Sequence, residues 1–122
     1  DAPRCKVGVL GITFKENCPD IRNSKVVDLV RELQTWGMDV VVADPIANPQ
    51  EVLHEYNLTL GTIDENHPVD ALVVAVGHNI YRALSAAQLR AYCRHASPVL
   101  ADIKSLYDRD ELAHAGFTVY RL

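Results

Sequence analysis

Short runs of apolar, largely β-branched residues alternate along the chain with segments in which apolar residues recur at helical spacing. The apolar runs predict buried strands, of which the run at 58–60 is the weakest: 6–12, 40–43, 58–60, 71–76, 99–102 and 117–120. Amphipathic or alanine-rich segments predict helices between them: 26–36, 49–56, 85–92 and 109–115. This alternation predicts a three-layer α/β/α fold whose mostly parallel sheet has five or six strands.

Residues that favour helix ends lie where this reading needs them. Ser24 precedes the first helical segment and Gly37 follows it. Asn48 is a candidate cap for the second helix, and Gly116 is placed to stop the last one. The boundaries therefore agree with the periodicity.

Length and composition limit the classes of function. The 122 residues fit one domain, which we assign to residues 1–122, and the apolar share of 48% is ordinary for a globular protein. A formal net charge of -4 argues against general affinity for nucleic acid. The apolar run 71–76 is far shorter than the roughly 18 to 20 residues that span a bilayer, so we expect no membrane partner.

The cysteines and the start of the sequence indicate a cytoplasmic piece of a longer protein. Cys5, Cys18 and Cys93 are an odd, sparse set without the spacing of a disulfide framework or a zinc site, so no metal is expected. Asp1 stands where an initiator Met would be, and no signal pattern follows it. We therefore expect further domains of the same polypeptide.

The loop after the first strand is the richest candidate site. In a parallel sheet, ligands collect beyond the carboxyl ends of the strands. Lys15 and Arg22 lie in this loop, just before a helix N-terminus that favours anions. Each alone fits a solvated charge, but together they fit two different phosphate groups. Asp20 is better suited to orienting or capping than to catalysis.

Three other polar residues follow predicted strands, and each has two readings. Lys104 is either a third cation of the same site or a surface charge. His78 fits a loop-capping residue better than a ligand contact. Asp44 stands where a dinucleotide-binding domain keeps a ribose-binding acid, although a turn-forming Asp-Pro is the default.

The glycines and Cys18 argue against independent catalysis. Gly8 and Gly11 form G-x-x-G without any G-x-G-x-x-G, so we interpret them as close-packing residues and expect no self-sufficient NAD fold. Cys18 near a helix start could have an activated thiol, but the sequence places no base beside it. We therefore interpret Cys18 as structural.

Residues 11–25, GITFKENCPDIRNSK, are similar to the signature that opens the C-terminal domain of the UDP-glucose/GDP-mannose dehydrogenase family. The wording most resembles the UDP-N-acetylhexosamine 6-dehydrogenase branch of bacterial polysaccharide biosynthesis. Residues 43–45, 75–78 and 102–104 agree, so the resemblance covers nearly the whole chain. It implies a Rossmann-like domain that lacks the glycine fingerprint.

The resemblance implies an NAD-dependent oxidation of a UDP-sugar C6 alcohol to a carboxylate, with two NAD consumed. The nucleophilic cysteine and the glycine fingerprint belong to N-terminal and central domains outside this chain, so the chain alone should be inactive. By the family pattern Lys15 contacts the sugar nucleotide at the active centre, and Arg22 reaches the NAD pyrophosphate across the domain interface. Lys104 matches a basic residue near the UDP end, where the UDP-glucose branch has Arg.

The family also implies a homodimer that forms through the central region, so the isolated chain should be monomeric. That same region builds most of the sugar pocket, and the sequence leaves open which N-acetylated sugar is oxidised. The alternative function is a non-catalytic nucleotide-binding or interaction module that uses the same phosphate loop. A glycine fingerprint and a cysteine motif upstream of Asp1 would distinguish the dehydrogenase from this module.

Overall fold

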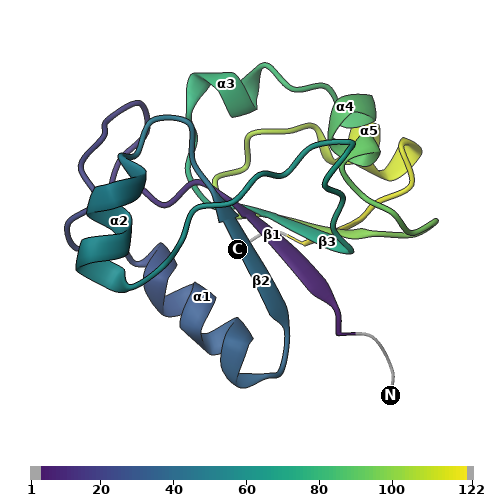
Figure 1. Cartoon of the computed structure of the whole chain (residues 1–122). Helices are drawn as coiled ribbons and strands as arrows, with labels where there is room; N and C mark the ends of the chain where they lie inside the picture. Colours follow the sequence, from purple (N-terminus) through teal and green to yellow (C-terminus); the bar gives the residue numbers. More distant parts are fainter. Residues whose placement is uncertain (1–3, 121–122) are drawn as a thin grey trace.

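Five parallel strands form one twisted sheet in the computed structural model, which describes residues 4–120 (Figure 1). Their order across the sheet is β2-β1-β3-β4-β5, and all neighbouring pairs are parallel. The strands are β1 Lys6–Leu10, β2 Asp39–Ala43, β3 Ala71–Val74, β4 Val99–Asp102 and β5 Thr118–Tyr120. The predicted mostly parallel sheet is confirmed, and it is parallel throughout.

Helices pack on both faces of the sheet, which confirms the predicted three-layer α/β/α arrangement (Figure 1). One face carries α1 (Val26–Thr35) and α2 (Pro49–Tyr56). The other carries the three short helices α3 (Asn79–Arg82), α4 (Ala86–Ala91) and α5 (Arg109–His114). In the part of the chain that the structure describes, no helix is long and apolar enough to cross a membrane.

Alternation along the strands divides the core between these two faces. Val9 of β1 packs in the cluster that includes Val30 of α1, whereas its neighbour Leu10 joins the cluster that includes Leu89 of α4 and Leu112 of α5. Burying one such side chain contributes roughly 1.5 to 3 kcal/mol. Since both faces are covered, the strands read as continuous apolar runs.

One predicted element is absent from the structure, and one unpredicted element is present. Residues 58–60 form no strand. This segment runs along the outer side of β2, and the backbone hydrogen bond to β2 comes only after it, from the Gly61 N–H to the Val42 carbonyl (2.7 Å). The chain also forms the short helix Asn79–Arg82, which we did not predict. Its four residues are too few to show a helical period.

The first helix begins at Val26 as predicted, but its cap differs from the prediction. Lys25 rather than Ser24 is its N-cap, and no side chain caps it. The Ser24 hydroxyl is buried without a hydrogen-bond partner, while the Ser24 N–H donates to the Tyr56 hydroxyl (3.3 Å). The Tyr56 hydroxyl in turn donates to the Ile21 carbonyl, so α2 fixes the entry to α1 in place of a local cap.

The predicted cap of the second helix is confirmed, because Asn48 accepts from the Gln50 and Glu51 N–H groups. The helix predicted from residue 85 begins one residue later, at Ala86, since Ser85 caps it in a capping box. Local side-chain chemistry is therefore sufficient at these two helices.

The strand order reverses between β1 and β3, because β1 connects outward to β2 while the chain after β3 continues to β4. The loops that follow these two neighbouring strands diverge at their carboxyl ends. Such a switch point is where open α/β sheets bind ligands, and the order found here is one of the two common ones.

Candidate functional site

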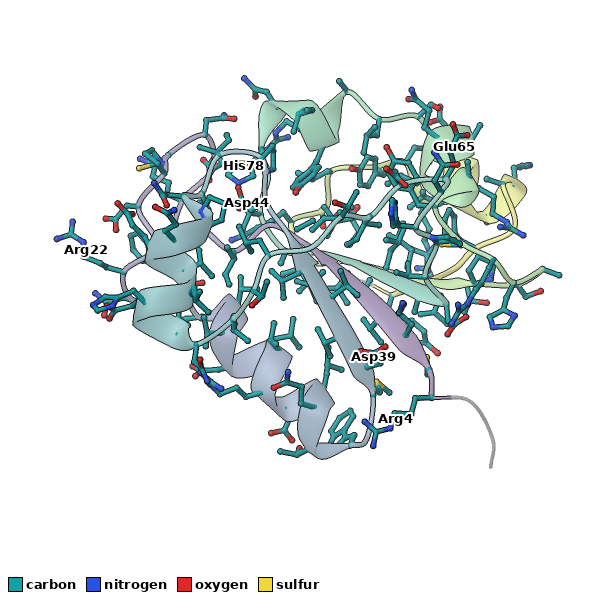
Figure 2. The ribbon with its side chains drawn as sticks, viewed as in Figure 1. Arg4, Arg22, Asp39, Asp44, Glu65 and His78 are labelled. Carbon is teal, nitrogen blue, oxygen red and sulfur yellow. The ribbon has the colours of Figure 1, made fainter. Side chains whose placement is uncertain are left out.

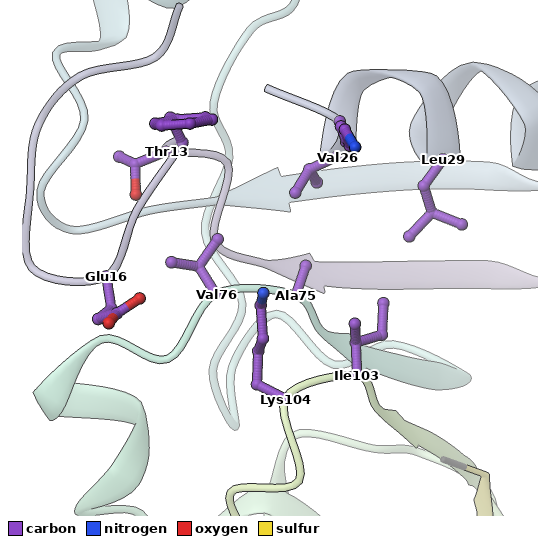
Figure 3. Close-up of a pocket in the computed structure, with 10 residues that line it drawn as sticks. Thr13, Glu16, Val26, Leu29, Ala75, Val76, Ile103 and Lys104 are labelled. Carbon is purple, nitrogen blue, oxygen red and sulfur yellow. The ribbon is translucent and has the colours of Figure 1, made fainter. Parts of the chain in front are cut away.

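A pocket of about 480 Å³ opens at this switch point, beyond the carboxyl ends of β1, β3 and β4 (Figure 3). Apolar side chains from α1 and from the segments that follow β3 and β4 form much of its wall, and two lysines and a glutamate lie on it. Its lining residues are Thr13, Phe14, Glu16, Lys25, Val26, Leu29, Ala75, Val76, Ile103 and Lys104. The pocket combines an apolar surface with cations, as an organic phosphate requires.

The structure divides the three cations that we predicted for the site. Lys104 lines the pocket. Lys15 is exposed on the loop between Phe14 and Glu16, both of which line the pocket. Arg22 instead borders a separate hollow beside α2. Figure 2 shows its side chain pointing outward, away from the sheet.

Asp20 holds the Arg22 guanidinium in place. Arg22 donates to the Asp20 carboxylate from Nε and from a terminal nitrogen, both at 3.0 Å, and from its backbone N–H at 2.9 Å. These side-chain bonds lower the pKa of the Asp20 carboxyl. The predicted orienting role of Asp20 is therefore confirmed, although the Arg22 side chain remains 81% exposed.

Lys25 is a pocket residue that we did not predict. It is the N-cap of α1, where the positive end of the helix dipole disfavours a cation by several tenths of a kcal/mol. A lysine at such a position is the signal that could have identified it. An anion in the pocket would interact with Lys25, Lys104 and the N-terminus of α1 together.

The two glycines of β1 and its loop serve close packing, as predicted. At Gly11, which has φ of +102°, a Cβ would lie 2.6 Å from the Val76 Cβ. At Gly8, a Cβ would lie 2.9 Å from a side-chain carbon of Ile63. At Gly11, which follows β1 where dinucleotide-binding domains keep glycines close to the pyrophosphate, the space is filled by the Val76 side chain.

Asp44 closes the end of β2 as a fully buried carboxylate. Its Oδ1 accepts from the N–H groups of Ile46 (2.8 Å) and Ala47 (3.0 Å), and its Oδ2 accepts from those of Ile12 (2.8 Å) and Thr13 (3.3 Å). Burial raises the pKa of Asp44, but the hydrogen bonds outweigh it and the pKa is lowered. The turn-forming reading is confirmed, and this buried carboxylate cannot bind a ribose.

His78 lies directly against Asp44, also fully buried (Figure 2). Its Nε2 is 2.9 Å from Asp44 Oδ2 and 3.2 Å from Thr13 Oγ1, and its Nδ1 accepts from the Asn17 N–H at 2.9 Å. The His78 carbonyl accepts from the Tyr81 N–H at the start of α3. The predicted loop-capping role is confirmed, and the ring also connects this loop to the loops that follow β1 and β2.

Cys18 is half-buried in the loop, and its N–H donates weakly to the Lys15 carbonyl (3.4 Å). Between residues 4 and 120 no histidine is hydrogen-bonded to its thiol, and both ring nitrogens of His78 are already engaged. That Cys18 is structural remains a prediction. Over the same residues, no three His, Cys, Asp or Glu side chains are grouped to hold a metal ion.

Comparison with known proteins identifies the family. The model of the UDP-glucose/GDP-mannose dehydrogenase family, UDP binding domain, matches residues 8–109. The chain is 40% identical over 106 residues to UDP-N-acetyl-D-glucosamine 6-dehydrogenase of Pseudomonas aeruginosa, covering 87% of this chain and 25% of that protein. The enzyme of the same name from Salmonella typhi is 38% identical over 96 residues, with 79% and 22% covered.

A solved structure agrees with these sequence relatives. The NDP-N-acetyl-D-galactosaminuronic acid dehydrogenase from Methanosarcina mazei Go1 superposes with a TM-score of 0.85 at 26% identity, over 97% of this chain and 24% of that one. The chain thus spans about a quarter of the length of these relatives. The resemblance seen in residues 11–25 is confirmed: the chain belongs to the UDP-glucose/GDP-mannose dehydrogenase family and matches its UDP binding domain.

Proposed function

We propose that this chain is the C-terminal, UDP-sugar-binding domain of an NAD-dependent UDP-N-acetylhexosamine 6-dehydrogenase and is inactive by itself. The pocket at the switch point carries the proposal, because it places Lys25 and Lys104 over an apolar wall in a chain of the UDP binding family. The names of the two bacterial relatives support an N-acetylated sugar. The complete enzyme would oxidise the sugar C6 alcohol to a carboxylate and reduce two NAD.

The pocket residues suit the parts of a UDP-sugar. Lys25 and Lys104 would bind the diphosphate, and the N-terminus of α1 would add favourable backbone dipoles. Phe14, which is 61% exposed at the pocket wall, offers a ring face for stacking on the uracil or the sugar. Lys15 would extend from the neighbouring loop to the sugar at the active centre.

NAD does not fit this chain as an independent site. Val76 fills the space beside Gly11 at the end of β1, and the Asp44 carboxylate is fully used within the protein. We therefore propose that another domain of the same polypeptide holds NAD and that the exposed Arg22 contacts its pyrophosphate. The nucleophilic cysteine would lie outside this chain as well. We further propose a cytoplasmic enzyme that is homodimeric at full length, whereas this chain alone is a monomer.

Calorimetric titration of UDP and of UDP-N-acetylglucosamine into the 122-residue chain tests the proposal. Binding is expected, and Lys25→Ala or Lys104→Ala should weaken it about 10- to 100-fold through loss of a charge-assisted contact. Lys6→Ala is the matched control, because it removes the same charge from the start of β1, at the end of the strand that faces away from the pocket. No binding, or equal weakening by all three substitutions, would overturn the proposed site. NADH formation by the chain alone would overturn its predicted inactivity.

A further inference from the structure

The buried pair of Asp44 and His78 lies behind the pocket loop and is not among the residues that line the pocket. His78 follows β3, yet its side chain contacts residues 61 and 65 positions away, in the loop that follows β1. These two loops belong to the adjacent strands of the switch point. A polar contact between them can therefore control the shape of the site.

His78 contacts the loop at two points that flank Lys15. At one end the Asn17 N–H donates to Nδ1 (2.9 Å). At the other, Nε2 lies 3.2 Å from the Thr13 hydroxyl, which itself donates to the Lys15 carbonyl (2.9 Å). Lys15 thus lies in the middle of a five-residue loop segment, residues 13–17, whose two ends both contact the His78 imidazole ring.

The contacts also define where the ring proton lies. A backbone N–H can only donate, so the Nδ1 of His78 that accepts from Asn17 carries no proton. The proton is on Nε2, facing Asp44 Oδ2 at 2.9 Å. Asp44 is held by backbone N–H groups on both of its oxygens, so it fixes the orientation of the ring.

The geometry points to His78 as a positioning residue: its neutral imidazole, oriented by Asp44, holds residues 13–17 in the conformation that presents Lys15 to the ligand. In its functional part this inference rests on the UDP-sugar site proposed above. A different role, filling the core beneath the loop, would depend on the volume of the ring and not on its two nitrogens.

Two substitutions separate these roles, because each keeps one of the two nitrogens. In His78→Asn the side-chain oxygen lies near the position of Nδ1 and can still accept from Asn17, whereas the donor to Asp44 is lost. In His78→Gln the amide N–H lies near the position of Nε2, whereas the acceptor for Asn17 is lost. Positioning predicts different effects of the two substitutions on the loop.

Amide hydrogen exchange at Asn17 measures the positioning without any ligand. His78→Gln should speed Asn17 exchange about tenfold relative to wild type, and His78→Asn should leave it within about twofold, after correction for global stability. UDP affinity should follow the same order, falling about tenfold in His78→Gln. Parallel changes in the two variants that follow only their stability would overturn the inference.

A spectroscopic measurement on the wild-type chain keeps the test decisive even if a variant does not fold. A long-range proton–nitrogen NMR spectrum of His78 should show a neutral ring protonated at Nε2. A ring protonated at Nδ1, or at both nitrogens, near pH 7 would overturn the inference. If wild type binds no UDP while Asn17 exchange still depends on Nδ1, the proposed function fails and the positioning role stands.

Discussion

Two aspartates at opposite ends of the parallel strands make similar hydrogen bonds in different surroundings. Asp44 follows β2 at the carboxyl edge, the side of the sheet where the strands end, and both it and its partner His78 are fully buried. Asp70 precedes β3 at the amino edge, where its 8% exposed side chain pairs with Arg94 and His95, which are 43% and 63% exposed. Each carboxylate also accepts a backbone N–H from the first strand or its loop.

The difference shows how one kind of interaction serves two purposes. The Asp70 carboxylate joins the start of β1, through the Lys6 N–H at 2.7 Å, to the Arg94 guanidinium, so it stabilises the side of the sheet where the strands begin. Asp44 joins the end of β2 to the loop that carries Lys15, through both backbone groups and His78. Asp70 therefore stabilises the fold, whereas Asp44 stabilises the fold and also shapes the candidate site.

The largest expected effect comes from removing the buried carboxylate. Asp44→Ala should lower the free energy of unfolding by about 3 to 5 kcal/mol, because it leaves a buried imidazole and several N–H groups without an acceptor. Asp70→Ala should lower it by about 1 to 2 kcal/mol, since water can hydrogen-bond to the exposed Arg94 and His95 in place of the lost carboxylate. Urea unfolding followed by circular dichroism measures both values. Equal losses would contradict the comparison.

Acid should remove the contribution of Asp70 within a defined range of pH. Hydrogen bonding from Arg94 lowers the pKa of Asp70 to about 2, against roughly 3.9 in the unfolded chain. A pKa that is lower in the folded state stabilises the protein above pH ~4, and this contribution is lost as the pH falls to about 2. Asp70→Asn should therefore flatten the stability profile between these values by about 1 kcal/mol, allowing for solvent screening at the exposed Arg94.

Unfolding free energies measured across that range, for wild type and Asp70→Asn, give the answer. Asp44→Asn is the comparison variant. Asp44 also has a lowered pKa, so it loses its contribution in acid in the same direction. A wild-type profile that stays flat between pH ~4 and ~2 would contradict the assignment.

The smallest effect is expected at the exposed cation of the loop. Arg22 pairs with Asp20 only two residues away and is 81% exposed, so Arg22→Ala should leave the unfolding midpoint unchanged. It should also leave the UDP affinity of the chain unchanged, because Arg22 borders a different hollow from Lys104. In the complete enzyme it should raise the KM for NAD, whereas Lys15→Ala should lower kcat and weaken use of the sugar nucleotide. A common shift in one KM would argue for a single shared phosphate site.

Much of the fold could be predicted because it depends on local chemistry. The helix Pro49–Tyr56 and its cap Asn48 match the prediction, since both depend on neighbouring residues. The weak run at 58–60 failed, because pairing at a sheet edge depends on where distant segments lie. The Ser24 cap failed for the same reason, since the Ser24 N–H donates to Tyr56, 32 residues away in sequence, while the Ser24 hydroxyl has no hydrogen-bond partner.

The site could be predicted only in part. The rule that ligands collect at carboxyl ends of strands identified the loop and Lys104. It did not indicate that His78 meets Asp44, which lies 34 residues away in sequence. That contact depends on β1 lying between β2 and β3, so it follows from the strand order and not from any spacing.

Chemical-shift mapping of UDP-N-acetylglucosamine on the 122-residue chain tests the proposed site most directly. A titration followed in proton–nitrogen correlation spectra should shift the amide signals of the pocket at three places, around Phe14, Val76 and Lys104. Signals near Asp70 at the amino edge should stay in place and provide the internal control. Shifts centred on Arg22 or on the amino edge, or no shifts at millimolar ligand, would contradict the proposed site.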